Sequence, residues 1–88
     1  PKPDAETARL VSAGIVRAAV AYSGGTAAAM LAMLAPNEAP LKQIPLFVIH
    51  ERIAVAAKKA GYENPRCAPP AAGEMARHIA AYLRAAEG

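Results

Sequence analysis

The sequence predicts an α/β fold with a parallel three-stranded sheet flanked by helices. Short apolar runs typical of buried strands alternate with segments of helical periodicity, and glycines or prolines separate the segments. Strands that alternate with helices of about ten residues or more are joined by right-handed crossovers, which makes the strands parallel. Three such strands would form half of a doubly wound domain, of the flavodoxin-like type.

The first half of the chain is expected to place one strand between two helices. Asp4 is a suitable N-cap for a helix over residues 5–13. Residues 15–22 are mostly apolar and rich in β-branched side chains, which predicts a buried strand. Residues 26–35 have the apolar spacing of a helix that ends before a proline, and residues 36–43 are expected to form a loop.

The second half repeats the strand–helix order twice. Residues 44–49 are the clearest strand, and residues 50–60 follow as a helix. The apolar stripe of that helix is expected to contain Ile53, Ala56, Ala57 and Ala60. Residues 62–67 hold a weaker strand that Pro65 interrupts, and residues 71–86 form a closing amphipathic helix.

Length and composition exclude several classes of protein. The 88 residues suffice for one domain or part of one, and 55% hydrophobic residues with a net charge of +3 exclude a charge-extended disordered chain. A single cysteine excludes an internal disulfide framework and fits a reducing, cytoplasmic compartment. The positive charge is spread along the chain without aromatic platforms, so we expect no nucleic-acid partner.

The chain is not expected to enter a membrane. Residues 13–35 are apolar enough to resemble a span, but they contain Arg17 and a polar break at residues 23–26. The first residues carry charges rather than the basic and apolar regions of a signal peptide. Because the chain begins with Pro1, we expect a processed piece or a fragment.

A turn composed of Ser23, Gly24, Gly25 and Thr26 follows the first predicted strand. Ligands of open parallel sheets bind beyond the carboxyl ends of the strands. The glycines let the backbone approach a ligand, and the free N–H groups and dipole of the helix start favour a carboxylate or a phosphate. Alternatively, Ser23 only caps the helix and the glycines only form the turn. The turn is not a dinucleotide fingerprint, which needs a third glycine.

The second predicted strand leads into His50, Glu51 and Arg52. A ligand-binding histidine would suit this position, and an arginine can hold a carboxylate through two parallel hydrogen bonds. The alternative is that His50 caps the helix, Glu51 interacts with the helix dipole and Arg52 is a solvated surface residue.

The remaining reactive side chains give no catalytic assignment. Cys67 would need a neighbouring base and a lowered pKa to act as a nucleophile, so we expect it to be a small buried side chain. Carboxylate pairs suited to acid–base chemistry are missing, and potential metal ligands are too sparse for a site. We therefore expect no metal site.

Two stretches resemble the C-terminal half of the uroporphyrinogen-III synthase family. Residues 18–26, AAVAYSGGT, resemble an apolar strand that runs into a Thr/Ser-rich loop and a leucine-rich helix. Residues 45–54, PLFVIHERIA, with Ala57 and Gly61–Tyr62, are similar to the family's strand, His/Ser-x-Arg-Ile/Leu-Ala segment, helix and Gly-aromatic turn. The first and last predicted helices also fit, so the resemblance covers nearly the whole chain.

The resemblance implies a cytoplasmic, cofactor-free lyase of tetrapyrrole, porphyrin and heme biosynthesis. Such an enzyme cyclises hydroxymethylbilane, a linear tetrapyrrole, to uroporphyrinogen III with loss of water and inversion of the last pyrrole ring. Family members are monomers with two α/β domains around a cleft. Residues 1–88 would be one α/β segment, the C-terminal portion, and the remainder of the synthase would be its partner.

The resemblance also implies roles for individual residues. Ser23, Gly24, Gly25 and Thr26 would bind acetate or propionate arms of the substrate, and His50 to Arg52 would form a second loop at the cleft. Tyr22 replaces a common Thr or Ser, and Glu51 replaces a common Pro. The tyrosine credited with assisting loss of the hydroxyl lies in the other domain, so the catalytic residue is unassigned and the chain alone is expected to be inactive. The alternative function is a non-catalytic module that binds a small carboxylated or phosphorylated ligand.

Overall fold

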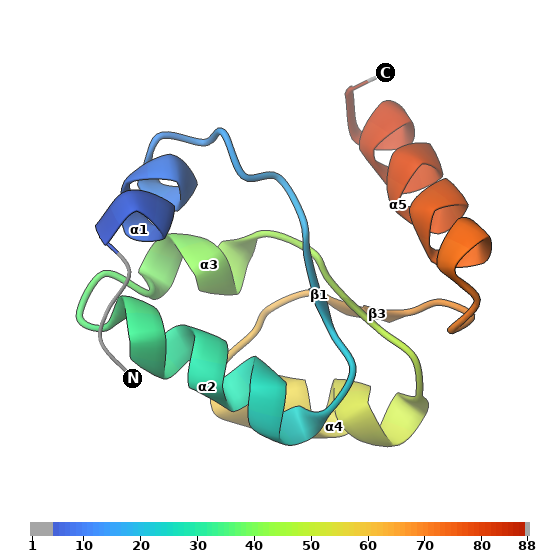
Figure 1. Cartoon of the computed structure of the whole chain (residues 1–88), viewed down its shortest axis with the longest axis horizontal. Coiled ribbons are helices and arrows are strands. Elements are labelled where there is room, and N and C mark those ends of the chain that lie inside the picture. Colours follow the sequence, from blue (N-terminus) through green and yellow to red (C-terminus); the bar gives the residue numbers. More distant parts are fainter. Residues whose placement is uncertain (1–4, 88) are drawn as a thin grey trace.

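Three parallel strands with helices on both sides confirm the predicted α/β fold (Figure 1). The computed structural model describes residues 5–87, so the predicted cap Asp4 lies outside the described residues. The elements are α1 (Ala5–Ser12), β1 (Ala19–Ala21), α2 (Gly24–Leu34), α3 (Ala39–Gln43), β2 (Leu46–Val48), α4 (Glu51–Ala60), β3 (Pro65–Cys67) and α5 (Ala72–Glu87). None of these helices is both long and apolar enough to span a membrane.

The sheet has the order β1-β2-β3, with β2 in the centre and all of its residues buried. Leu46 pairs with Ala19 on one side and with Pro65 on the other. Each crossover among the described strands moves in the same direction along the sheet. A doubly wound sheet contains a reversal of this direction, so the three strands fit one half of such a sheet without establishing a flavodoxin-like order.

The two faces of the sheet are covered unequally. Helices α2 and α4 lie side by side on one face, and α5 lies on the other (Figure 1). The core on the α2/α4 face consists of Val11, Ala21, Ala27, Leu31, Leu34, Leu41, Leu46, Val48, Ala54, Ala57 and Tyr62. Among the residues whose burial the structure describes, the core on the α5 face contains the buried residues Phe47, Ala68 and Met75.

The strands are shorter than the apolar runs that predict them. β1 occupies only residues 19–21, towards the C-terminal end of the expected strand over residues 15–22, and Ile15 is 62% exposed. The N–H of Ala19 donates a hydrogen bond to the carbonyl oxygen of Pro45 at 3.0 Å. Pro45 has no N–H of its own, so it cannot donate the next hydrogen bond to the strand before Ala19. The ladder between β1 and β2 therefore stops at this proline. β3 begins at Pro65, a position where a strand tolerates proline.

The helices match the predicted periodicity except in two places. α2 buries Ala27, Leu31 and Leu34 on one side, which fits the apolar spacing of residues 26–35, but α3 lies within residues 36–43, which were predicted as a loop. The predicted stripe of α4 is partly wrong. Ala54 and Ala57 are buried and Ile53 packs beside them, whereas Ala56 and Ala60 are exposed. Because alanines lie on all sides of α4, hydrophobicity alone does not identify its inner face.

Tyr62 links the two helices of the larger layer. α4 ends at Gly61, whose φ of 124° suits a residue without a side chain, and the next residue turns inward. The Tyr62 side chain is 1% exposed, and its hydroxyl donates to the carbonyl oxygen of Ala27 in α2 at 2.7 Å. Burial raises the pKa of Tyr62 to about 12, so the hydroxyl keeps its proton.

Candidate functional site

The two predicted ligand-binding segments lie at the carboxyl edge of the sheet. β1 ends at Ala21 and leads into residues 23–26, and β2 ends at Val48 and leads into His50. Ala21 and Val48 are paired in the parallel ladder, so the two strand-to-helix turns start side by side. The structure thus confirms the predicted position of both turns. Binding of an anion there stays a prediction.

Both hydroxyls of the first turn take part in capping α2. Ser23 is the N-cap, and its Oγ accepts a hydrogen bond from the N–H of Thr26 at 3.0 Å. The Ser23 hydroxyl in turn donates to Oγ1 of Thr26 at 2.9 Å. Among residues 5–87, no hydrogen bond engages the N–H groups of Gly24 and Gly25. An anion at this turn would therefore be held by these N–H groups and by the Thr26 hydroxyl proton.

The two glycines of this turn have different roles. A Cβ on Gly24 would lie 3.0 Å from the Cβ of Ala56, so a hydrogen at this position is what allows α2 to approach α4. A Cβ on Gly25 would meet only the Ser23 Oγ, at 3.9 Å. Gly24 is therefore required for the packing of α2 against α4, and Gly25 is the glycine that leaves the backbone of the turn accessible to a ligand. The sequence does not distinguish the two residues because their spatial neighbours come from α4.

His50 caps α4, which is the simpler of the two roles predicted for this residue. Its Nδ1 accepts a hydrogen bond from the N–H of Arg52 at 3.0 Å. In a neutral imidazole this leaves the proton on Nε2, which can donate to a ligand. The Arg52 side chain is exposed and makes no ion pair with another described residue, so its guanidinium is available to an anion.

Cys67 is exposed, contrary to the prediction of a buried side chain. Its thiol donates to Oε2 of Glu51 at 3.3 Å, across the gap between β3 and α4. Desolvation, this hydrogen bond and the negative charge of the carboxylate all raise the pKa of Cys67. The thiolate is disfavoured, which argues against a nucleophilic role. The exposure follows from the position of β3 at the edge of the sheet, which the sequence does not reveal.

A shallow cavity of about 420 Å³ lies at the carboxyl ends of β2 and β3. Its lining consists of Ile49, His50, Glu51, Cys67, Ala68 and Pro69. The cavity brings His50 next to the Glu51–Cys67 pair, whereas residues 23–26 do not line it. The predicted site residues thus share one edge of the sheet without converging on one cavity. In residues 5–87, no group of three or more His, Cys, Asp or Glu side chains is arranged to hold a metal ion.

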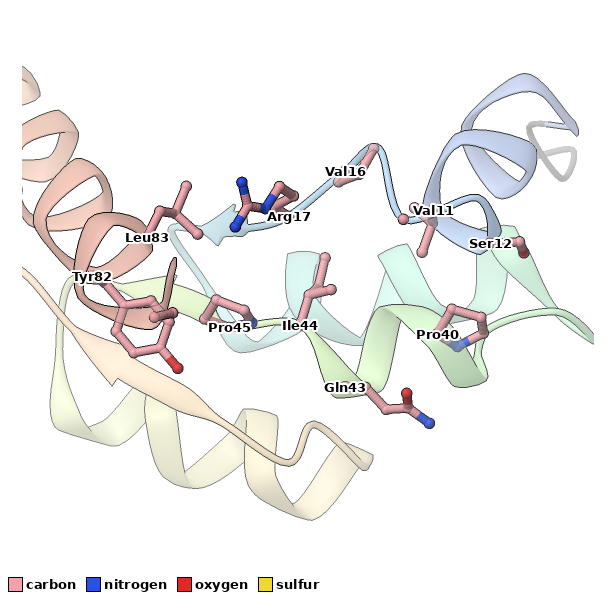
Figure 2. A pocket seen from close by; sticks show the side chains of 12 residues that line it. Val11, Ser12, Val16, Arg17, Pro40, Gln43, Ile44, Pro45, Tyr82 and Leu83 are labelled. Atoms are coloured by element: carbon pink, nitrogen blue, oxygen red, sulfur yellow. The ribbon is translucent and has the colours of Figure 1, made fainter. Parts of the chain in front are cut away.

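A second cavity, of about 510 Å³, lies at the opposite, amino edge of the sheet (Figure 2). Helices α1, α3 and α5 contribute to its walls, together with the loop before β1. Sequence reasoning missed this cavity. The one local signal is Arg17, a charge between two apolar segments.

No protein-family model matches this chain, and no match was found among curated proteins or solved structures.

Proposed function

We propose that the carboxyl edge of the sheet binds a carboxylate-rich linear tetrapyrrole, and that the chain is the C-terminal portion of a uroporphyrinogen-III synthase. In this proposal the chain contributes one wall of a cleft in which hydroxymethylbilane closes to uroporphyrinogen III. The chain alone binds without converting the substrate, because the rest of the synthase supplies the second wall.

The observation that carries the proposal is the pairing of two helix starts at one sheet edge. α2 and α4 both begin there, after neighbouring strands, and each has a side-chain cap. The remaining N–H groups in the first turn of a helix have no partner within the helix. Two such positions side by side suit a ligand with several carboxylates better than a ligand with one. Arg52 adds an exposed positive charge at the second position.

Glu51 sets a limit on how such a ligand lies. Its carboxylate is in the first turn of α4 and lines the cavity at β2 and β3. Because like charges repel, the acidic arms of a ligand should lie on the β1 side, at residues 23–26 and Arg52. The apolar wall formed by Ile49 and Ala68 then faces a pyrrole ring.

Gly25 offers the sharpest test of binding, since a side chain there blocks the free N–H groups without touching α4. We expect Gly25→Leu to weaken binding of uroporphyrinogen III, measured anaerobically by calorimetry, by about tenfold. Ala32→Leu is the matched control, because Ala32 is exposed on α2 far from the turn. Gly24→Leu is unsuitable, because it would displace Ala56.

The alternative function, a module for a small phosphorylated ligand, is tested with the same variants. Binding of glucose 6-phosphate without binding of uroporphyrinogen III would replace the first proposal by the alternative. Equal binding of the tetrapyrrole by the Gly25→Leu and Ala32→Leu chains would remove the turn from the site. In a polypeptide that joins this chain to a second α/β domain, isomer III must exceed the isomer I that forms without enzyme.

A further inference from the structure

The cavity at the amino edge combines an apolar wall with one cation. Figure 2 shows Leu83 of α5, Arg17 and Val16 along one rim, and Pro45 and Ile44 along the facing rim. The volume of about 510 Å³ lies in the range of small-molecule sites. The cavity is at the opposite end of the strands from residues 23–26, so a ligand here would be independent of the tetrapyrrole proposal.

Arg17 already holds a carboxylate at the rim of this cavity. Its guanidinium donates to Oε2 of Glu87, in the last turn of α5 and seventy positions along the chain. The side chains of Arg17 and Glu87 are 48% and 54% exposed. Ion pairs this exposed contribute little to stability, so another carboxylate can replace Glu87 at low cost.

We propose that this cavity binds an amphipathic monocarboxylate, an apolar chain or ring that ends in one carboxylate. The ligand's carboxylate takes the place of Glu87 on Arg17, where the guanidinium can bind it through two parallel hydrogen bonds. The apolar part lies against Val16, Ile44 and Leu83. Burial of apolar surface supplies most of the affinity, and Arg17 selects for the charge.

Octanoate and octanol separate these two contributions, because they share an apolar chain and differ in charge. Binding is followed by two-dimensional NMR titration of the whole chain. Arg17→Gln should weaken octanoate about tenfold and leave octanol unchanged. Glu87→Gln should strengthen octanoate severalfold, because the competing carboxylate is gone. Hexanoate should bind about fifteenfold more weakly than octanoate, at about fourfold for each lost methylene.

Arg9→Gln is the matched control. Arg9 forms an exposed pair with Glu6 on α1 that lies outside the cavity lining, so its loss changes the net charge equally. All four side chains of the two pairs are exposed, and circular dichroism verifies that each variant folds. Equal affinity for octanoate and octanol, or equal weakening by Arg17→Gln and Arg9→Gln, would reduce the binding to adsorption on apolar surface and overturn the proposal. An unchanged affinity in Glu87→Gln would overturn the exchange of carboxylates.

Discussion

The two faces of the sheet differ in how firmly their helices are held. On one face, α2 and α4 pack on Leu46 and Val48, and Tyr62 ties the layer together through a buried hydrogen bond. On the other face, α5 lies apart from the rest of the helices and covers a small core (Figure 1). The first face thus resembles the interior of a complete domain, whereas the second depends on a single helix.

A single aromatic residue anchors much of α5. The Tyr82 ring packs edge-on against Phe47, with centroids 5.9 Å apart, and the Arg66 guanidinium lies 4.5 Å from its centroid. The Tyr82 hydroxyl accepts a hydrogen bond from Nδ2 of Asn64 at 2.8 Å. α5 is therefore docked through a few specific contacts, and regions with few buried contacts are the ones that open first. Three predictions test this difference between the faces, and a fourth tests the contact between α4 and the edge strand β3.

Truncation in the larger core should have the largest effect. Leu46 is fully buried in the central strand, so Leu46→Ala should lower the free energy of unfolding by about 3–5 kcal/mol, measured by urea denaturation. Leu83→Ala removes the same atoms from a half-buried position on α5 and should cost about 1 kcal/mol or less. Equal losses in the two variants would contradict the difference between the faces.

Truncation in the smaller core should act locally. Met75→Ala removes one of the buried residues on the α5 face and should cost about 2 kcal/mol. Hydrogen exchange should become faster in the amides of α5 while α2 and α4 keep their protection. If α2 and α4 lose protection to the same extent, the molecule unfolds as one unit and α5 is as firmly held as the other layer.

The buried hydroxyl of Tyr62 makes the larger layer sensitive to alkali. Tyr62→Phe removes one hydrogen bond and should cost about 1 kcal/mol at neutral pH. The pKa of Tyr62 is about 12 in the folded chain and about 10 in the unfolded chain, so the unfolded state loses its proton first. Stability from this group is therefore complete below pH 10 and is lost as the pH rises towards 12.

The comparison of wild type with Tyr62→Phe isolates this loss from the titration of other groups. The free energies of unfolding of the two proteins should converge above pH 10, because only the wild type has a phenol to ionise at position 62, whereas Tyr22 and Tyr82 are present in both. A constant difference from pH 7 to pH 11, measured by urea denaturation, would show that the hydroxyl is not held in the protonated form by burial.

The smallest expected effect concerns reactivity rather than stability. Glu51→Gln removes the carboxylate that raises the pKa of Cys67, so the thiolate forms at lower pH and alkylation by iodoacetamide is faster at mildly alkaline pH. Glu63→Gln is the matched control, because this exposed carboxylate makes no contact with the thiol in the hydrogen-bond network. Equal alkylation rates in the two variants would show that α4 does not hold Glu51 against β3.

Local chemistry in the sequence determines the order of the elements and the position of both turns. Ser23 and His50 cap helices with their own side chains, and Gly61 ends α4 with a positive φ, so neighbouring residues alone define these boundaries. The apolar run around β2 indicates a buried central strand. Because all strands of a parallel sheet end at the same edge, these local features also predict that both turns lie there.

Only the tertiary structure decides which residues meet across the fold. The inner face of α4, the separate roles of Gly24 and Gly25, and the bond between Cys67 and Glu51 all depend on distant neighbours. The amino-edge cavity is lined by residues of α1, α3 and α5, and the ion pair between Arg17 and Glu87 joins residues seventy positions apart. Alanine and glycine have small side chains or none, so their pattern along a helix does not show which side of the helix faces the core. Packing against larger side chains from other elements determines how these helices are rotated and which residues remain exposed.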